Sequence, residues 1–438
     1  MSKGSCMAML LAGALALGGC GTNAPGAGDG SAAGGTEEKK PAEKPAEKPP
    51  EPVTLKFHQL GVYFTPEDFK LLLADPVKKK YPHITLEMIN YSKDLANLLS
   101  TGETVDFLVT YNGQLAPHKD LDVLEDITPL AKKHNFDLSR FDPGAIDALK
   151  TASDKGELYA LPYAVNLNAL YYNKDIFDKF GVAYPKDGMS WDEAIDLGAK
   201  LTRREGDVQY RGIEVDNLNR LLFPLSLNVV DANTNKAMAD SDAYKKVFEV
   251  GKRMFSIPGN EYLAGLNNRF MKDKNVAMAG TVNLFLSLKQ TPDLNWDIAQ
   301  FPSYKERPNL YGMYDLHLLI PMKMSKHKDD VMRVMEVMFS DEVQTTMVRK
   351  TARISTLQDP KYVEQYAKDI PELAGKRIES IFKSKPAPAQ AFSKHFVKAS
   401  ALLNTEYVEY LNNKIDVNTA LRNAEEKINQ MIKSENSK

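Results

Sequence analysis

The stretch from Gly156 to Gly181, GELYALPYAVNLNALYYNKDIFDKFG, concentrates four tyrosines and three asparagines around a Leu-Pro pair. Aromatic rings offer flat apolar faces, and amide side chains both donate and accept hydrogen bonds. The stretch holds no pair of nucleophile and base of the kind that covalent catalysis uses. Its residue types therefore favour the binding of a polar solute over catalysis.

Motifs for metals, cofactors and catalysis are missing from the sequence. The seven histidines show no H-E-x-x-H spacing, and neither a G-x-S-x-G nor a P-loop sequence occurs. The segment Asp231 to Asn235 is similar to half of a calcium loop, but Lys236 stands where such a loop needs glycine. We therefore expect no metal site and no cofactor. Acidic residues are plentiful, so a surface glycoside hydrolase with two carboxylates across a cleft stays an alternative.

The N-terminal residues predict export and a lipid anchor. Lys3 precedes an apolar run from Met7 to Leu17, which is much shorter than the roughly 20 residues of a membrane-spanning helix. It fits the apolar part of a signal peptide, which we place at residues 1–19. The sequence LGGC at residues 17–20 resembles a bacterial lipobox, in which cleavage leaves a lipid-bearing cysteine as the new N-terminus. We expect Cys20 to anchor the protein to the extracytoplasmic face of the cell membrane; an ordinary signal peptide with a chance cysteine is the alternative.

The two cysteines are Cys6 and Cys20. Cys6 lies in the predicted signal peptide and Cys20 would carry the lipid, so we expect no disulfide and no cysteine-based metal site. Residues 20–52 begin with small residues and continue with a Pro/Glu/Lys mixture that repeats PAEK. Such a composition does not bury enough apolar surface to fold, which predicts a disordered tether.

The remaining chain, residues 53–438, is long enough for two domains. The formal net charge is −2 and the sequence has no basic stripe, so we expect no nucleic-acid partner. No second long apolar segment predicts a membrane span.

Alternating strands and helices predict a parallel sheet in the first part of this region. Apolar and polar residues alternate at residues 53–57 and 84–89, the period of half-buried strands, and residues 105–109 are the third expected strand. Thr65 and Pro66 predict a helix start, and we expect that helix to end at Asp75-Pro76. A shorter helix at residues 94–100 completes the alternation.

Later segments continue the α/β pattern. Ser190 with Glu193 three residues on predicts a helix start with a capping box, and Gly181 predicts a helix end. The other expected strands are 170–172, 297–301 and 315–320, and the other expected helices are 175–180, 243–254, 282–289, 329–339, 396–411 and 417–433. We expect the last hundred residues to be almost entirely helical.

Six short motifs occur in a set order along the chain: DVLEDITP at 122–129, GELYALPY at 156–163, LYYNKD at 170–175, SWDE at 190–193, VAM at 276–278 and DEVQ at 341–344. Together they resemble the extracellular solute-binding proteins of ABC importers, family 1, the group that includes maltose-binding protein. Each motif alone is weak, but their order and spacing cover nearly the whole region after residue 53.

The resemblance implies an α/β fold of the two-lobed, periplasmic-binding-protein-like type II, with discontinuous lobes joined by a hinge. Lobe one would comprise residues 53–164 and 297–340, and lobe two residues 165–296 and 341–438. The segment Pro162–Asn168 would be the first of three crossings between them. A monomer that binds its solute in the interlobe cleft and delivers it to ABC permease subunits is expected. The same fold also serves ligand-sensing partners of membrane histidine kinases, which stays a second alternative.

Turns at the carboxyl ends of strands line such clefts, and together with the resemblance they indicate the ligand-binding residues. We expect this set to comprise His58, Gln59, Tyr111, Asn112, Tyr163, Asn166, Asn168, Asn283, Tyr311, Tyr314, Arg353 and Phe396. Thr110 and His317 are nearby candidates, and Arg353 has an interlobe or helix-end ion pair as its alternative role. We expect no catalytic residue. The family most often carries sugars, so we expect a carbohydrate or oligosaccharide as the solute, with tyrosines in place of the tryptophans that usually stack on sugar rings.

Overall fold

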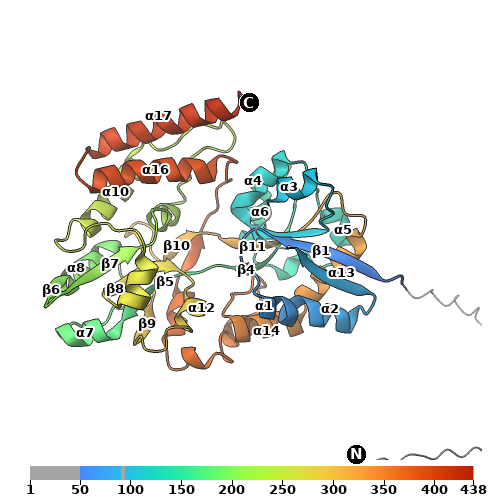
Figure 1. Cartoon of the computed structure of the whole chain (residues 1–438), viewed down its shortest axis with the longest axis horizontal. Helices are drawn as coiled ribbons and strands as arrows, with labels where there is room; N and C mark the ends of the chain where they lie inside the picture. Colours follow the sequence, from blue (N-terminus) through green and yellow to red (C-terminus); the bar gives the residue numbers. More distant parts are fainter. Residues whose placement is uncertain (1–49, 90–93, 438) are drawn as a thin grey trace, which may run out of the picture. The chain divides into compact units, whose positions relative to one another are not determined.

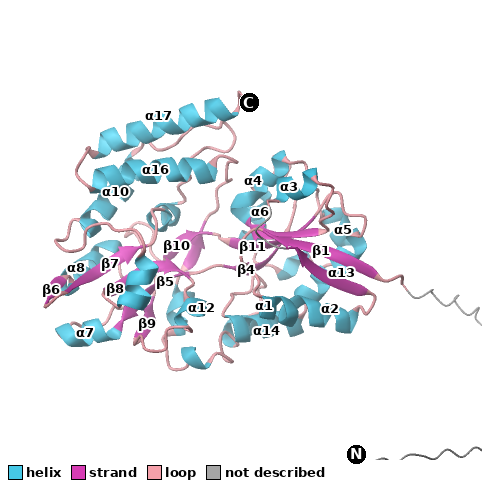
Figure 2. Ribbon diagram, viewed as in Figure 1, coloured by secondary structure: helices cyan, strands magenta, loops and turns pink. Residues whose placement is uncertain are grey.

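The computed structural model describes residues 50–89 and 94–437. The predicted signal peptide, Cys20 and the tether up to residue 49 lie outside the described residues. From Pro50 onward the chain forms a single unit built around two sheets of five strands (Figures 1 and 2).

The first sheet contains the three strands predicted near the N-terminus. Its strand order is β2-β1-β3-β11-β4, with β1 parallel to β2 and β3, and β11 antiparallel to β3 and β4. The strands are β1 (Val53–Gln59), β2 (Ile84–Ile89), β3 (Phe107–Tyr111), β4 (Leu161–Val165) and β11 (Leu316–Pro321). The predicted parallel pairing is confirmed, and β3 begins two residues later than expected.

The second sheet has the order β6-β7-β8-β5-β9. Strands β7 and β8 are parallel, whereas β5 runs antiparallel to β8 and β9. The strands are β5 (Asn168–Asn173), β6 (Arg203–Glu205), β7 (Val208–Val215), β8 (Val276–Val282) and β9 (Trp296–Ala299). A separate parallel pair joins β10 (Leu310–Met313) and β12 (Lys385–Ala387).

Helices cover both sheets (Figure 2). Those that pack with the first sheet or follow its strands are α1 (Pro66–Phe69), α2 (Asp75–Lys80), α3 (Leu95–Ser100), α4 (Leu115–Asp120), α5 (Thr128–Lys133), α6 (Pro143–Lys150), α13 (Lys328–Met338), α14 (Asp341–Thr351) and α15 (Lys361–Glu364). Those that follow strands of the second sheet or close the chain are α7 (Lys174–Phe180), α8 (Trp191–Leu201), α9 (Asn219–Leu222), α10 (Asp242–Phe255), α11 (Leu266–Asn268), α12 (Phe285–Leu288), α16 (Phe396–Leu411) and α17 (Val417–Glu435). Helices α10, α16 and α17 pack against one another.

The first helix does not end at Asp75-Pro76 as predicted. A π-helical turn, η1 (Lys70–Ala74), connects α1 to α2, and helical backbone continues to Lys80. The amide of Asp75 donates to the carbonyl of Lys70, so the turn is wider than an α-turn. The wider turn accommodates the proline, which lacks an N–H and would clash with a regular α-helical turn.

Two other predictions need correction. The segment expected as a helix at 282–289 is the end of β8 followed by the short α12. Residues 352–395, expected to be mainly helical, contain only short helical turns and β12. Four prolines in this segment, Pro360, Pro371, Pro386 and Pro388, explain the difference because proline does not continue a helix.

Local end signals are confirmed. Ser190 forms both halves of a capping box with Glu193 at the start of α8. Gly181 ends α7 in the left-handed conformation with φ of 63°, which glycine adopts at no steric cost.

The chain passes directly from the first sheet to the second between Val165 and Asn168, and it re-enters the first sheet between Met313 and Leu316. These two passages bring residues of both sheets side by side. Strand β9 belongs to the second sheet, and α14 packs against η1 and α13 beside the first. The lobe boundaries stay a prediction, to which we return below.

Candidate functional site

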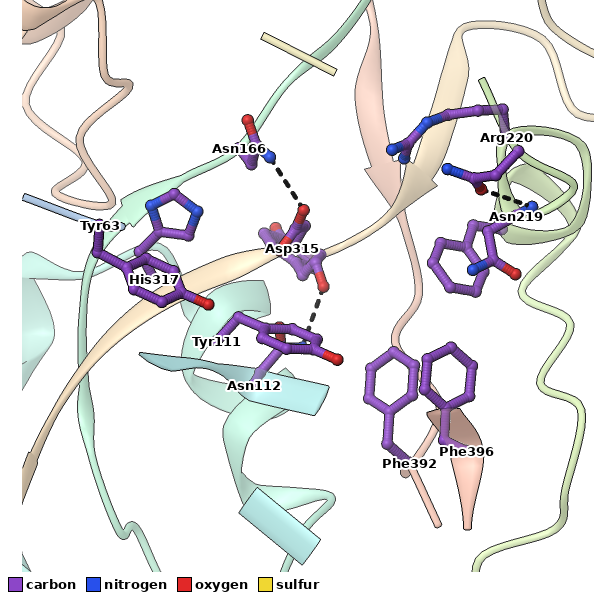
Figure 3. Close-up of a pocket in the computed structure, with 13 residues that line it drawn as sticks. Tyr63, Tyr111, Asn112, Asn166, Asn219, Arg220, Asp315, His317, Phe392 and Phe396 are labelled. Atoms are coloured by element: carbon purple, nitrogen blue, oxygen red, sulfur yellow. Dashed lines mark hydrogen bonds between the residues drawn. The ribbon is translucent and has the colours of Figure 1, made fainter. Parts of the chain in front are cut away.

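A pocket of about 310 Å³ lies where these two passages meet. Figure 3 shows the residues that line it. They are Tyr63, Tyr111, Asn112, Asn166, Asn217, Asn219, Arg220, Phe223, Tyr314, Asp315, His317, Phe392 and Phe396. The lining combines amides, phenols, one carboxylate, one guanidinium and three phenylalanine rings.

Asn112 and Asn166 hold the β10–β11 connection in place. The side chain of Asn112 donates to the carbonyl of Tyr314 (3.0 Å) and accepts from the amide of Leu316 (3.0 Å). Asn166 donates from its backbone amide to the carbonyl of Asp315 (2.8 Å) and from its side chain to the carboxylate (3.1 Å). These bonds fix the position of Asp315 at the centre of the lining (Figure 3).

Three tyrosines surround Asp315. Burial raises the pKa of Tyr63, and the charge of Asp315 raises it further. Burial also raises the pKa of Tyr111. Tyr314 donates its hydroxyl to the carboxylate of Asp142 (2.6 Å), the residue that caps α6. All three phenols are therefore neutral at physiological pH, and they offer hydroxyl groups together with apolar ring faces.

The opposite wall comes from the start of α9. Asn217 accepts a hydrogen bond from the amide of Asn219 (3.0 Å). Arg220 pairs with Asp216, with its Nε 2.8 Å and one Nη 3.3 Å from the carboxylate oxygens. Because this bidentate pair balances the guanidinium charge, the wall is polar without a free positive charge.

Phe223, Phe392 and Phe396 form an aromatic cluster beside this wall. The ring centroids of Phe392 and Phe396 are 4.8 Å apart at an interplanar angle of 68°, and Phe223 stacks on Phe396 at 6.2 Å. Phe396 is the first residue of α16, whereas Phe392 and Phe223 remain half-buried. The cluster gives the pocket a rigid apolar surface facing its polar side.

His317 lies on β11, behind the ring of Tyr63. The two rings meet edge to face at 5.0 Å, and Tyr163 lies 5.9 Å away. Burial lowers the pKa of His317 to about 4, so its imidazole is neutral at pH 7.

Of the twelve predicted ligand-binding residues, the structure brings five together in this pocket: Tyr111, Asn112, Asn166, Tyr314 and Phe396. Of the two further candidates, His317 lines the pocket, whereas Thr110 is buried in β3 and does not.

Three predicted residues on the first sheet lie outside the lining. His58 and Tyr163 have no exposed surface, and Tyr163 stacks on Phe64 at 5.1 Å. Gln59 is 2% exposed. Its side chain accepts from the amides of Tyr63 (3.0 Å) and Phe64 (2.9 Å) and donates to the carbonyl of Phe64 (3.1 Å). Gln59 therefore supports the loop that carries Tyr63 rather than lining the pocket itself.

The other four also bond within the protein. Asn168 donates to the carbonyl of Tyr311 (2.8 Å), and the hydroxyl of Tyr311 points to the carbonyl of Asn166 at 3.5 Å. Asn283 donates to the carbonyl of Ala352 (3.0 Å).

Arg353, which is 9% exposed, donates to the carboxylate of Asp68 and to the carbonyl of Tyr63, both at 2.7 Å. This is the ion-pair role that the sequence analysis offers as its alternative.

Seven lining residues were not among the sequence candidates: Tyr63, Asn217, Asn219, Arg220, Phe223, Asp315 and Phe392. Asp315 is the first residue of the predicted strand 315–320 and directly precedes β11 in the structure, which is a signal that strand-end reasoning could have used. The segments around residues 217–223 and 392 carry no local pattern that indicates a shared site.

Comparison with known proteins identifies the family. A family described as "Bacterial extracellular solute-binding protein" matches residues 73–372, more than half of the chain. The chain belongs to this family. The predicted resemblance and the prediction of a binding protein rather than an enzyme are confirmed, and an extracytoplasmic location follows from the family.

Solved structures with low sequence identity share the fold of this solute-binding protein. The ABC substrate-binding protein Lmo0181 of Listeria monocytogenes, solved in complex with cycloalternan, is 19% identical with a TM-score of 0.72 and covers 87% of this chain and 99% of its own. The sugar-binding protein MalE of Xanthomonas citri is 17% identical with a TM-score of 0.69, covering 88% and 98%. The predicted two-lobed fold of periplasmic binding proteins is confirmed.

A curated relative in Brucella abortus, named as a binding protein, is 26% identical over 203 residues. That match covers 43% of this chain, and it spans about half of the relative's length, 48%.

Two further findings concern residues 50–89 and 94–437. In this part of the chain, no helix has both the length and the apolar character that a bilayer span requires. The same residues contain no group of three or more histidine, cysteine, aspartate or glutamate side chains placed to hold a metal ion.

Proposed function

We propose that this protein captures a carbohydrate in the pocket between its two sheets and delivers it to the permease of an ABC importer. The observation that carries the proposal is the composition of the pocket: amides, phenols and one carboxylate face a cluster of three phenylalanines. Sugars present hydroxyl groups around their edge and C–H groups on their ring faces, so both sides of such a pocket have matching partners. The fold neighbour that was solved in complex with cycloalternan supports the same class of solute.

The pocket also lacks what the hydrolase alternative of the sequence requires. Such enzymes need two carboxyl groups set across the scissile bond. Among the described residues, Asp315 is the one carboxylate in the pocket lining. The nearby carboxylate of Asp216 forms an ion pair with Arg220. The pocket therefore lacks the second carboxyl group that a glycoside hydrolase needs.

A thermal-shift screen of neutral mono- and oligosaccharides tests the proposal, followed by calorimetry on each hit. A solute that binds only the folded state raises the unfolding free energy by about 2.7 kcal/mol at a concentration of 100 Kd. We expect Phe392→Ala to weaken binding of the hit about tenfold because it removes one ring of the aromatic cluster. Val363→Ala, which truncates an exposed side chain outside the pocket, is the matched control. A screen without any saccharide hit, or a saccharide that is chemically altered on incubation, would contradict the proposal.

We propose further that the two sheets belong to separate lobes that close on the solute. As predicted from sequence, lobe one comprises residues 53–164 and 297–340 and lobe two residues 165–296 and 341–438. The pairing of β9 in the second sheet and the packing of α14 against α13 favour moving both later boundaries toward the C-terminus. Small-angle scattering with and without the hit tests closure, since a decrease in the radius of gyration is expected on binding.

We also propose that a lipid on Cys20 anchors the protein to the extracytoplasmic face of the membrane. The LGGC sequence at residues 17–20 supports it. Labelled palmitate should be incorporated into the wild-type protein and not into the Cys20→Ser variant, and equal labelling of both would rule out Cys20.

A further inference from the structure

We propose that the pocket selects neutral or cationic polar solutes and rejects anionic ones, and that Asp315 is the residue that sets this selectivity. The inference rests on the proposed function in one respect, namely that this pocket is the solute site. It adds the charge class of the solute, which neither the family nor the fold determines.

The carboxylate of Asp315 accepts its hydrogen bond from a neutral donor. Its recorded partner is the side-chain amide of Asn166 at 3.1 Å, and no ion pair to Asp315 is found among residues 50–89 and 94–437. Figure 3 shows the side chain of Asp315 among the other lining residues, between Asn166 and Tyr111. The protein therefore presents a negative charge to any solute without a cation beside it.

Both guanidinium groups near the pocket are already balanced. Arg220 pairs with Asp216 at 2.8 Å, and Arg353, behind Tyr63, pairs with Asp68 at 2.7 Å. Each guanidinium charge is balanced by its own carboxylate, so neither arginine adds an unpaired positive charge beside Asp315.

The remaining titratable groups add no positive charge. His317 is half-buried beside Tyr63, and its imidazole is neutral at pH 7. Asp142 lies just behind the lining, where it accepts the hydroxyl of Tyr314 at 2.6 Å, so it contributes a second negative charge close to the pocket. The sum of the charges on and behind the lining is negative.

A solute hydroxyl or ammonium group satisfies a carboxylate by donating a hydrogen bond to it. A solute carboxylate has no proton to donate at pH 7, and it is repelled by the like charge of Asp315. We expect an acidic sugar to bind at least about tenfold more weakly than its neutral counterpart.

Calorimetry with matched solutes tests the inference on the whole folded protein. The panel contains glucose, glucuronate and glucosamine, the corresponding galactose set, maltose, and two solutes that are not sugars, spermidine and citrate. Each is titrated into the wild type, into Asp315→Asn, and into Asp273→Asn, which removes the same charge from an exposed position outside the pocket.

The expected result is that only neutral or cationic members bind the wild type and Asp273→Asn. Asp315→Asn should reduce the preference for the neutral over the acidic form at least about fivefold, since the asparagine still accepts a hydrogen bond but carries no charge. Thermal unfolding of the three proteins shows whether each is folded.

Several outcomes would overturn the inference: an acidic member that binds best, a panel in which nothing neutral or cationic binds, or an unchanged preference in Asp315→Asn. Binding of spermidine without any saccharide would refute the carbohydrate proposal while supporting the charge selectivity. Binding of glucuronate in preference to glucose would do the reverse.

Discussion

Substitution of Gly144 by alanine provides a test of how α6 positions the pocket. A Cβ at this position would lie 2.4 Å from the hydroxyl oxygen of Tyr314 and 3.0 Å from the ring carbon that bears it. Real Cβ atoms do not approach other atoms so closely, so the ring of Tyr314 has to move. The movement breaks the bond from Tyr314 to Asp142 and displaces a residue of the pocket lining.

Two opposing contributions set the expected change in stability. Alanine favours a helix over glycine by up to about 1 kcal/mol, and by less in the first turn, where Gly144 lies. The lost hydrogen bond to a carboxylate is worth about 1.5–3 kcal/mol. The net expectation is that Gly144→Ala lowers the free energy of unfolding by about 1–2 kcal/mol.

Urea unfolding and calorimetry with the solute found in the screen measure the two effects separately. Tyr314→Phe is the matched control, because it removes the same hydrogen bond while the ring keeps its place. We expect both variants to lose stability, and Gly144→Ala to weaken solute binding by about tenfold, which is more than Tyr314→Phe does because only the first displaces the ring. A Gly144→Ala protein with wild-type stability and affinity would refute the described packing of Tyr314 on α6.

Three further predictions concern stability. Gln59→Ala should lower the free energy of unfolding by about 1–3 kcal/mol in urea titrations, because two buried backbone amides of the Tyr63 loop lose their acceptor. Hydrogen bonds from Lys305 and Arg253 lower the pKa of the Asp192 carboxyl in the folded protein. The ionised carboxylate therefore stabilises the folded state at any pH above the pKa of Asp192 in the unfolded chain. This stabilisation is lost as the pH falls through the lower pKa of the folded protein. Asp192→Asn should therefore be less stable than the wild type at pH 7, with the difference vanishing in acid; a constant difference would exclude the charge as its cause. Ser190→Ala should lower the free energy of unfolding by about 1 kcal/mol in thermal unfolding, since it removes the N-cap of α8. Ser190→Thr should retain most of the wild-type stability, because threonine also caps a helix.

Much of the backbone could be predicted because its signals are local. Apolar alternation marks β1 and β2, and a serine followed by a glutamate three residues on marks α8. The error at Pro76 has a local cause of another kind, since one π-turn is enough to carry a helix past a proline. A π-turn holds one residue more than an α-turn, and no pattern of residue types in this segment indicates that extra residue.

The sequence by itself determined that the chain encodes an α/β solute-binding protein, and that amides and tyrosines at strand ends, such as Asn112 and Asn166, are candidates for its site. It did not determine which of these side chains face the pocket. Gln59 is the last residue of β1 and Asn112 directly follows β3 of the same sheet, yet only Asn112 lines the pocket, because the side chain of Gln59 bonds to the amides of its own loop.

Only the tertiary structure decided that Phe392 and Arg220 complete the pocket. They lie in segments more than 150 residues apart, and they meet because the segment after β12 returns to the core of the second sheet, where the ring of Phe392 contacts that of Phe223. Local sequence patterns report on the neighbours that a residue has along a helix or strand. They carry no information on a contact whose geometry depends on how separate sheets pack.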